Sequence, residues 1–453
     1  MGVPCSAKKQ TTALSVDSPG KILSEILRGW KEKSWSERVA RGGTPTRICA
    51  FRHGPIVPPL YGALIRSYEF LLYLVKRGHK VSLYYYGEAN RRGAHRGVSC
   101  IEVRRGFASS SRLGSLAYGV EGEWGFKLLL SSAPRLVTNA VEEIRASDVV
   151  YVEHIWSSLF PILYARILGK PSVLDNHNVE TILANRSRQE ARGFVRHVIS
   201  FLWLFYVLLL ERVSCSLADL VVVTSETDRH LLCKILGISK KKIEVIPNGV
   251  DLETFRPSRE DGLNARATLG IDRNAPVIAF VGMLDYPPNL YALRWIVKEL
   301  ALKIFQRMPD ARFLIVGRNP PEELMAEDSR IIFTGEVQSV VAYINASDVC
   351  IAPMTVGSGT RMKILSYLSC EKPVVSTPLG VEGLDSCVMA CVSVGHLDEF
   401  PSLISDLLLN RQRLPRMQMR ESILGYDWRS LSAKLESLLV QLAEPRRGHA
   451  TEL

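Results

Sequence analysis

The sequence predicts an α/β protein with two Rossmann-like, doubly wound domains that face each other across a cleft. Short apolar, β-rich runs alternate with longer helical patterns, which is typical of a parallel sheet covered by helices. This alternation occurs twice, on either side of a polar, Pro-containing stretch at 252–267. The chain has 453 residues, of which 47% are hydrophobic, so it is long and apolar enough for two or three domains.

The first series contains five expected strands. A helical pattern at 63–78 follows the first strand, and the run IEVIPNGVD at 243–251 ends the series. The strands are expected at 47–51, 80–86, 148–153, 171–176 and 219–224. We therefore expect an N-terminal Rossmann-like domain over 46–255. A basic appendage at 1–45 precedes it, and a helix is plausible there over 21–39.

The second series follows the stretch at 252–267, which we interpret as a linker between the domains. Its strands are expected at 277–282, 311–317, 330–335, 348–354 and 372–377. They are again short, β-rich and separated by helical patterns, so a second parallel sheet is predicted over 256–425. In two such domains, ligands bind at the carboxyl ends of the strands, in the cleft between the halves.

Composition limits the partners and the location. The formal charge of +11 and the pI near 9.2 favour anionic partners. No zinc-finger spacing, RNA-binding aromatic signature or basic zipper is present, so we expect no nucleic acid partner. The nine cysteines are scattered and none forms a Cys-x-x-Cys, which indicates reduced, structural cysteines in a cytosolic protein. The N-terminus lacks an apolar signal core, and a cytoplasmic location is expected.

One segment, VISFLWLFYVLLL at 198–210, is apolar on every side apart from Ser200. A run of this length is shorter than the roughly 20 residues that span a bilayer. It is either a buried core helix or a helix that lies in the plane of a membrane surface. Four arginines precede it, as an anchor on acidic lipid requires: Arg186, Arg188, Arg192 and Arg196.

Residues 357–363 read GSGTRMK and join a glycine-rich turn to a helix. The turn and the helix dipole together make an anion site from backbone amides, including those of Gly359 and Thr360. Arg361 and Lys363 are unfavourable at a helix N-terminus, by about 0.3–1 kcal/mol each. They become favourable around a diphosphate, which accepts bidentate hydrogen bonds from Arg and attracts the point charge of Lys. A solvated helix start with Thr360 as N-cap is the alternative.

The run VIPNGVD at 245–251, followed by FRP at 255–257, resembles the retaining glycosyltransferases of the GT-B fold, family 4 (glycosyl transferases group 1). Five further segments resemble parts of these enzymes in the same order. They lie at 66–83, 174–180, 280–289, 357–377 and 426–439. The likeness runs from Arg47 to about Leu439. It implies a closing helix at 426–445 that crosses back to the first domain, before a tail at 446–453.

The resemblance implies a hexosyltransferase-type enzyme that moves a sugar from a nucleotide-diphosphate sugar to an acceptor with retention of configuration. The donor diphosphate is then expected at Gly62, Gly359, Thr360, Arg361 and Lys363, and the donor nucleotide at Gly282, Glu336, Val337 and Ser366. His177 follows a strand and is expected at the reaction centre, with His154 as the second choice. A core histidine is the alternative for each, because a lone histidine is more often structural.

No Asp-x-Asp metal motif is apparent, and enzymes of this fold use protein cations in place of a metal. We therefore expect no metal and no cofactor other than the nucleotide sugar as co-substrate. The expected acceptor is lipid-linked or a surface glycan precursor. The protein would reach this acceptor through reversible, peripheral contact of residues 198–210 with the inner face of the membrane.

Ser366 departs from the family pattern. Relatives typically carry Glu in this helix, where it accepts hydrogen bonds from the ribose of the donor. Charge-assisted hydrogen bonds contribute about 1.5–3 kcal/mol each, so their loss should weaken donor binding. The alternative function is therefore a non-catalytic GT-B protein or scaffolding subunit. A sugar-nucleotide epimerase of the same architecture is a third possibility, against which VIPNGVD argues.

Overall fold

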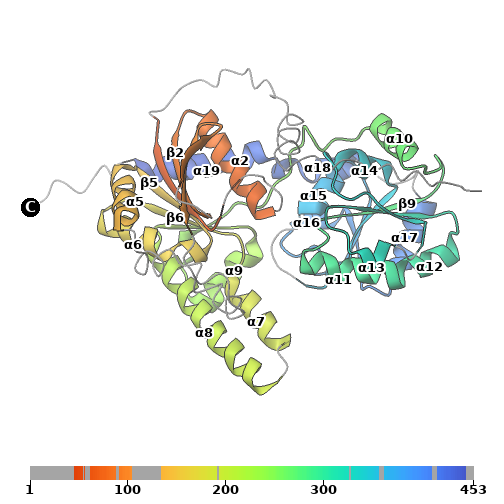
Figure 1. The fold of residues 1–453 in the computed structure, drawn as a ribbon, viewed down its shortest axis with the longest axis horizontal. Helices are drawn as coiled ribbons and strands as arrows, with labels where there is room; N and C mark the ends of the chain where they lie inside the picture. Colours follow the sequence, from red (N-terminus) through yellow and green to blue (C-terminus); the bar gives the residue numbers. More distant parts are fainter. Residues whose placement is uncertain are drawn as a thin grey trace, which may run out of the picture. The chain divides into compact units, whose positions relative to one another are not determined.

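The computed structural model describes residues 45–54, 56, 62–87, 91–104, 134–190, 193–325, 328–356, 362–410 and 416–444. The helix expected at 21–39, the tail expected at 446–453 and the glycine-rich turn at 357–361 lie outside these residues. The described part contains two sheets, each flanked by helices (Figure 1). The predicted α/β fold with two Rossmann-like halves is confirmed.

The N-terminal sheet has eight strands in the order β3-β4-β2-β1-β5-β6-β7-β8. They are β1 (Arg47–Arg52), β2 (Lys80–Gly87), β3 (Arg91–His95), β4 (Val98–Arg104), β5 (Val149–Glu153), β6 (Ser172–Asn176), β7 (Leu220–Val223) and β8 (Ile243–Val245). The β3–β4 pair is antiparallel, whereas every other pair is parallel. The five predicted strands, β1, β2, β5, β6 and β7, are parallel as expected, and the antiparallel strand β3 was not predicted. The sequence of β3, RRGAH, has no apolar alternation that would reveal it.

Both faces of this sheet are buried, as a doubly wound fold requires. Ile48 and Ala50 of β1 pack into one core, and Cys49 and Phe51 pack into the core on the opposite face. The helices of this half are α2 (Gly62–Lys76), α5 (Pro134–Ala146), α6 (Leu159–Ile167), α7 (Glu180–Glu190), α8 (Phe194–Leu217) and α9 (Glu226–Leu236).

The C-terminal sheet has six parallel strands in the order β11-β10-β9-β12-β13-β14. They are β9 (Val277–Val281), β10 (Arg312–Val316), β11 (Ile331–Phe333), β12 (Val349–Ala352), β13 (Val374–Ser376) and β14 (Val392–Val394). The helices are α10 (Arg259–Thr268), α11 (Pro287–Trp295), α12 (Ala301–Arg307), α13 (Glu322–Met325), α14 (Val341–Ala346), α15 (Met362–Ser369), α16 (Ser386–Met389), α17 (Phe400–Leu409) and α18 (Arg416–Glu421). A π-helical segment, Ile296–Leu300, joins α11 to α12.

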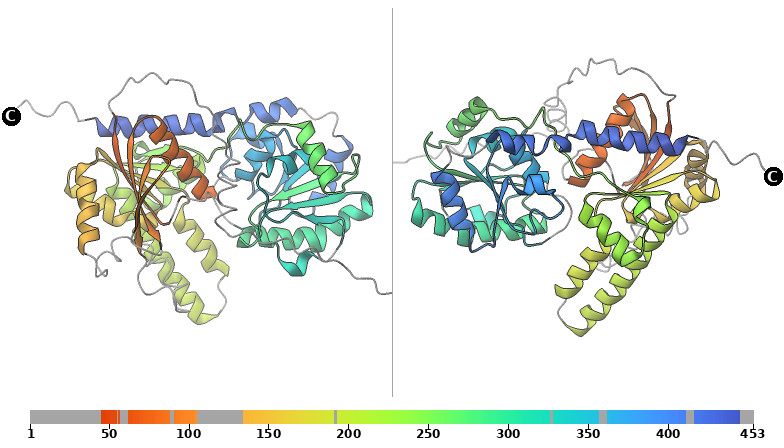
Figure 2. Two further views of the ribbon diagram at one scale, coloured as in Figure 1. Left: turned by 45° about the horizontal axis from the view of Figure 1, so that its top comes forward. Right: turned by 180° about the vertical axis from the view of Figure 1, so that it is seen from behind.

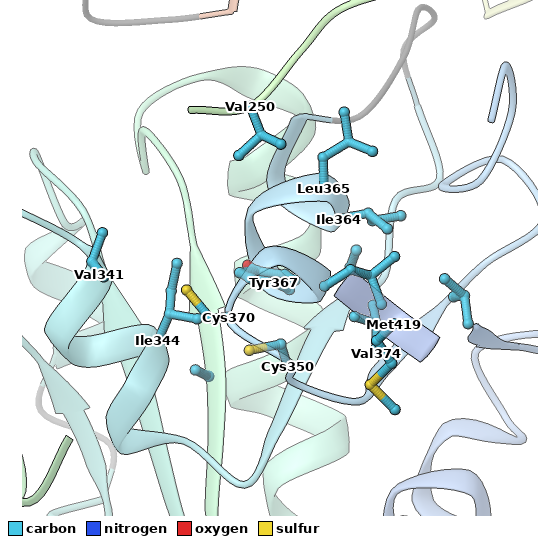
Figure 3. Close-up of a cluster of buried hydrophobic side chains, with 14 of the residues drawn as sticks. Val250, Val341, Ile344, Cys350, Ile364, Leu365, Tyr367, Cys370, Val374 and Met419 are labelled. Carbon is cyan, nitrogen blue, oxygen red and sulfur yellow. The ribbon is translucent and has the colours of Figure 1, made fainter. Parts of the chain in front are cut away.

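The core beneath α15 fixes the position of that helix on the sheet. Its side chains come from α14, α15 and the strands below them, and Tyr367 lies in their midst (Figure 3). The Tyr367 hydroxyl accepts a hydrogen bond of 2.9 Å from the backbone N–H of Val281, at the end of β9. Burial raises the pKa of the Cys350 and Cys370 thiols to about 12, so both behave as apolar core residues.

The stretch at 252–267, interpreted as a linker, is in part a structural element. Residues 259–268 form α10, which Ser258 caps by accepting a hydrogen bond from the Asp261 N–H at 3.2 Å. A Cβ at Gly262 would lie 2.5 Å from the carbonyl oxygen of Asn345, so α10 packs directly on the end of α14. The polar composition of the stretch concealed this contact, because it rests on a small residue and not on an apolar stripe.

The last helix, α19 (Trp428–Ala443), belongs to the C-terminal end of the chain but packs on the N-terminal sheet. The indole of Trp428 meets the Phe70 ring of α2 edge-on, with centroids 5.5 Å apart. Three leucines spaced four residues apart continue the buried stripe along the helix: Leu431, Leu435 and Leu439. The predicted crossing helix is confirmed.

Helices α7 and α8 lie side by side and extend beyond the sheet (Figures 1 and 2). The helix around 198–210 is longer than the apolar run, with 24 residues from Phe194 to Leu217. It is the one described helix that is long and apolar enough to cross a membrane, by length and composition alone. The inference that this segment is too short to span a bilayer was therefore wrong, because the helix continues past the apolar run at both ends.

Candidate active site

The carboxyl ends of β1, β5 and β6 gather ionisable side chains in the N-terminal half. The strand order changes direction between β1 and β5, since β2 lies on one side of β1 and β5 on the other. Ligands of open α/β sheets bind outside the strand ends at such a point. Arg52 ends β1, Glu153 ends β5, and Asp175 is the second-last residue of β6. These three residues are buried.

Asp175 is the centre of this cluster. It forms a fully buried, bidentate ion pair with Arg66 of α2, with both N–O distances at 2.9 Å. The Tyr151 hydroxyl donates a further hydrogen bond of 2.6 Å to the same carboxylate. Burial opposes ionisation of Asp175, but the Arg66 guanidinium and His177 outweigh it and hold the pKa of Asp175 below its usual range.

Arg66 also donates hydrogen bonds to the backbone of the VIPNG segment. Its Nη1 lies 2.9 Å from the carbonyl oxygen of Ile246 and 3.0 Å from that of Pro247. One side chain thus joins the end of β6 to the start of the chain that leaves the N-terminal sheet. The VIPNG segment, on which the family resemblance rests, therefore contacts the same network as the histidine segment.

The structure brings the two predicted histidines together. The rings of His154 and His177 have centroids 4.2 Å apart, and His177 Nε2 lies 3.4 Å from Asp175. Burial, His177 and Arg52 hold the pKa of His154 well below its usual value, so His154 is neutral near pH 7.

His154 also has φ 63° and ψ 148°, a conformation that non-glycine residues rarely adopt and that is found preferentially at functional sites. The assignment of both histidines to the reaction centre stays a prediction, and the structure places their two rings next to each other.

Glu180 and Glu211 form an acidic pair next to these histidines. Glu180 Oε1 lies 3.8 Å from His154 Nδ1. Glu211, from α8, accepts hydrogen bonds at the N-terminus of α7, from the backbone N–H groups of Glu180 at 3.0 Å and Thr181 at 2.9 Å. Burial and the charge of Glu211 raise the pKa of Glu180 to about 7. Through Glu211, the projecting helix α8 is joined to the loop that carries His177.

In the C-terminal half, Lys363 is held in the first turn of α15. Its Nζ donates a hydrogen bond of 2.8 Å to Asn289 Oδ1 and lies 4.3 Å from the centroid of the Phe280 ring. A Cβ at Gly282 would lie 2.8 Å from Asn289 Nδ2, so Gly282 permits this close approach. The structure therefore brings together two of the predicted donor-site residues, Lys363 and Gly282, through Asn289.

The other predicted donor residues are spread around this edge of the C-terminal sheet. Gly62 begins α2, and a Cβ there would lie 3.2 Å from Met362 Sδ, the first residue of α15. Glu336 is exposed and Val337 is half-buried, after β11 at the edge of the sheet. Gly359, Thr360 and Arg361 lie outside the described residues.

Ser366 is half-buried, and its hydroxyl donates a hydrogen bond of 3.1 Å to the carbonyl oxygen of Met362, one turn earlier in α15. This bond satisfies the hydroxyl within its own helix. Because position 366 is a serine, α15 carries no carboxylate there. No group of three or more potential metal ligands occurs among the described residues. Independence from a metal stays a prediction.

The sequence analysis missed the charged residues that surround the histidines: Arg52, Arg66, Glu153, Asp175, Glu180 and Glu211. A signal for three of them exists, because Arg52, Glu153 and Asp175 end or nearly end predicted strands. Polar residues at the carboxyl ends of buried strands are candidates for a site in this fold class. Glu211 gives no such signal, since it lies far along a mostly apolar helix.

Two Rossmann-like halves with polar sites at their strand ends, and a final helix that returns to the first half, define a GT-B architecture. Family models agree: "Glycosyltransferase Family 4" matches residues 62–254, and "Glycosyl transferases group 1" matches residues 275–410. Between them the two models cover more than half of the chain. The chain belongs to the family 4 glycosyltransferases.

Relatives with a named activity share only part of their sequence with this chain. An Escherichia coli UDP-Gal:alpha-D-GlcNAc-diphosphoundecaprenol alpha-1,3-galactosyltransferase is 28% identical over 243 residues, 50% of this chain and 57% of the relative. A D-inositol 3-phosphate glycosyltransferase of Mycobacterium sp. (strain KMS) is 27% identical over 177 residues, 36% of this chain and 38% of the relative. The matched region thus spans less than two thirds of either relative.

Solved structures share the fold. Sucrose-phosphate synthase from Thermosynechococcus elongatus superimposes with a TM-score of 0.64 at 18% identity, covering 88% of this chain and 99% of that chain. Anabaena HepE in complex with UDP superimposes with a TM-score of 0.61 at 15% identity, covering 87% of this chain and all of that chain. At this level of identity the likeness concerns the fold alone.

Proposed function

We propose that this protein is a retaining glycosyltransferase that moves a hexose from a nucleoside diphosphate sugar to an acceptor. The observation that carries the proposal is the ammonium group of Lys363, held by Asn289 in the first turn of α15. A cation fixed at a helix N-terminus is suited to the diphosphate that leaves when the sugar is transferred. HepE, which shares the fold, has been solved with UDP.

In this proposal the two halves have different tasks. Lys363 stabilises the charge that develops on the leaving diphosphate, and no metal is needed because the cation comes from the protein. His154 and His177 hold hydroxyl groups of the transferred sugar. His154 is neutral, so its ring can both donate and accept a hydrogen bond. The Asp175 carboxylate lies 3.4 Å from His177 Nε2, and both ring nitrogens of His177 have no hydrogen-bond partner among the described residues, so they are available to a sugar hydroxyl.

The test is incubation of the purified protein with a panel of UDP, GDP and ADP sugars, while nucleotide diphosphate release and glycoside formation are followed. Transfer to an added acceptor with retained anomeric configuration, seen by NMR, is the expected result. Conversion of the sugar without release indicates an epimerase. Binding of the nucleotide without turnover of any donor indicates the non-catalytic alternative, which the arrangement of Ser366 keeps open.

We further propose that the protein is cytoplasmic, that its acceptor is lipid-linked, and that α8 contacts the anionic inner face of the membrane. The N-terminal part of α8 exposes a large apolar surface: Phe194, Val195, Val198, Phe201, Leu202, Phe205 and Leu209. Phe194 is 85% exposed and Phe205 is 63% exposed, whereas Val207 and Leu210 are buried in the N-terminal core. The E. coli relative acts, by its name, on a diphosphoundecaprenol acceptor.

The structure changes which residues should serve in this contact. Trp203 stacks on Trp156, with centroids 5.7 Å apart, and so packs against the core. Arg186 forms an ion pair with Glu382, with an N–O distance of 3.2 Å, and does not extend toward lipid as an anchor would. Arg196, near the start of α8, is exposed and retains the expected role.

Flotation with liposomes tests this contact. Binding should require acidic lipid and weaken as salt increases, because basic residues contribute roughly 1 kcal/mol each near an anionic surface. The Phe201→Ser, Phe205→Ser double variant should remain in solution. As a matched control, Leu302→Ser with Leu409→Ser removes two exposed leucines from the C-terminal half and should bind as wild type does. A wild-type protein that never floats contradicts the membrane contact.

A further inference from the structure

Arg52 and Glu153 form a second polar site in the N-terminal half, next to the histidines but distinct from them. Both side chains are buried, with relative exposures of 6% and 1%. They end β1 and β5, the two strands that flank the change in strand direction. Their nearest charged atoms, Arg52 Nε and Glu153 Oε2, are 3.8 Å apart, which is an ion pair without a hydrogen bond.

Several polar atoms of this pair have no hydrogen-bond partner among the described residues. They are Nε and Nη1 of Arg52 and Oε1 of Glu153. The other carboxylate oxygen, Oε2, is in contact with the hydroxyl of Ser67 on α2. Buried polar groups are nearly always paired, because an unpaired group loses its hydrogen bonds to water without replacement. Two donors and one acceptor left unpaired at the switch point of a sheet therefore indicate a ligand.

The unpaired atoms specify what kind of ligand group fits. A hydroxyl group can donate to Glu153 and accept from Arg52 at the same time. An anionic group, such as a phosphate, would be attracted by Arg52 but repelled by Glu153. The neighbouring residues add no net charge to the Arg52–Glu153 pair. Arg66 neutralises Asp175 in a bidentate pair, and His154 is neutral.

We propose that Arg52 and Glu153 bind vicinal hydroxyl groups of the acceptor, and that the acceptor group which receives the sugar is an uncharged carbohydrate ring. His154 follows Glu153 directly and is 17% exposed, so solvent reaches this edge of the cluster. A ring held here lies beside both histidines, which are proposed to hold the transferred sugar. The inference rests on the proposed glycosyltransferase function and gives its acceptor a chemical class.

This acceptor class separates two kinds of relative. The E. coli enzyme is named for an acceptor whose terminal group is a GlcNAc, with the charged diphosphate further along. The mycobacterial enzyme is named for inositol 3-phosphate, in which a phosphate is attached to the acceptor ring itself. The opposite charges of Arg52 and Glu153 suit an uncharged ring such as GlcNAc. They do not suit a ring that carries a phosphate, because Glu153 would repel it.

The test compares two sets of acceptor probes with one active donor. The first set is octyl glycosides of glucose, galactose and N-acetylglucosamine, and the second is the corresponding 6-phosphates together with inositol 3-phosphate. Transfer to at least one neutral glycoside, with about 10-fold or more lower kcat/KM for its phosphorylated form, is expected. Preference for the phosphorylated probes overturns the inference.

Two variants locate the effect. Glu153→Gln keeps the size of the side chain and removes its charge, and Arg52→Lys keeps the charge and removes the unpaired Nε. Each should raise the acceptor KM by about 10-fold or more, while the donor KM changes less than 2-fold. Asp328→Asn, which makes a similar exchange in a partly exposed pair with Arg330, serves as the matched control. Unchanged acceptor KM in both folded variants overturns the inference.

A binding measurement keeps the inference separate from the proposed function. Calorimetric titration of the folded protein, saturated with UDP, with the same octyl glycosides needs no turnover. If no donor is turned over but a glycoside binds, and Glu153→Gln abolishes that binding, the proposed function fails and the site stands. If donors are turned over but neither binding nor acceptor KM depends on Glu153, the site fails and the function stands.

Discussion

The two halves of this protein build their sites in opposite ways. At the strand ends of the N-terminal sheet, buried charges pair with one another around Asp175. At the corresponding edge of the C-terminal sheet, Gly282 permits the close approach of Asn289, which accepts a hydrogen bond from Lys363. One half is a buried network in which Arg66 and Tyr151 both pair with Asp175. The other holds a lysine in the first turn of a helix, which suits an anionic ligand.

This difference predicts that a substitution in the N-terminal network mainly affects stability, whereas one at the C-terminal edge mainly affects binding. Arg66→Ala gives the largest expected effect. It leaves Asp175 as a buried, unpaired carboxylate and removes two hydrogen bonds to the VIPNG backbone. Loss of one partner from such a pair costs about 3–5 kcal/mol of unfolding free energy. Denaturant unfolding followed by circular dichroism measures it.

Arg294→Ala is the control for that measurement, because it removes an arginine from an exposed ion pair with Glu323. Its unfolding midpoint should match that of the wild type. Arg66→Lys keeps the charge but loses the bidentate geometry, so it should lie between wild type and Arg66→Ala. An Arg66→Ala protein as stable as the wild type would show that the network can rearrange around Asp175.

The second effect is a pH dependence of stability that arises at Glu180. Its pKa is raised to about 7 in the folded protein, above the ordinary value of 4.5. Between these two values the folded state binds more protons than the unfolded state, so the unfolding free energy falls as pH rises. Glu180→Gln removes this term. Its loss of stability between pH 5 and pH 8 should be smaller than that of the wild type, by on the order of 3 kcal/mol.

Unfolding curves of both proteins at pH 5 and pH 8 give this double difference directly. Glu323→Gln is a suitable control, since Glu323 lies on the surface of the C-terminal half with 62% of its side chain exposed. It should follow the wild type at both pH values. A Glu180→Gln protein with the same pH dependence as the wild type would place the titrating group elsewhere.

The sequence predicted more of the C-terminal site than of the N-terminal network, for a physical reason. Gly282 and Lys363 lie in local motifs, and the strand that precedes Gly282 and the helix that carries Lys363 are evident from their patterns. The contacts of Arg66 with Asp175, and of Glu211 with α7, join residues that are far apart in the chain. Pattern alone places each on a helix or strand but does not pair them. The fold was predictable because the predicted strands of both sheets are strongly apolar. Strand β3 was missed because its sequence, RRGAH, is not.

The third effect is a loss of nucleotide binding in Lys363→Met. Methionine keeps an unbranched apolar chain against the Phe280 ring and removes the ammonium group, so the fold should be unaffected. We expect UDP to bind roughly 10- to 100-fold more weakly, as measured by calorimetry. Lys303→Met, on the exposed side of α12, is the control and should bind UDP as the wild type does. Equal affinities in the two variants would remove Lys363 from the donor site.

The smallest expected effect concerns Ser366, and it tests whether the C-terminal edge still has room for the carboxylate that relatives carry. The Ser366 hydroxyl is satisfied by Met362 within α15, and the side chain is half-buried, so a longer side chain can reach outward from the helix. Ser366→Glu should then tighten UDP binding by about 10-fold, the gain from one charge-assisted hydrogen bond to the ribose. Ser366→Ala, which removes only the bond to Met362, should leave the affinity within about 2-fold.

If Ser366→Glu weakens binding while Ser366→Ala does not, the site is shaped around serine and the missing carboxylate has been replaced by a different arrangement. If neither variant changes the affinity, Ser366 does not face the nucleotide. Donor turnover, measured on the same two variants, then shows whether this position limits the reaction as well as the binding.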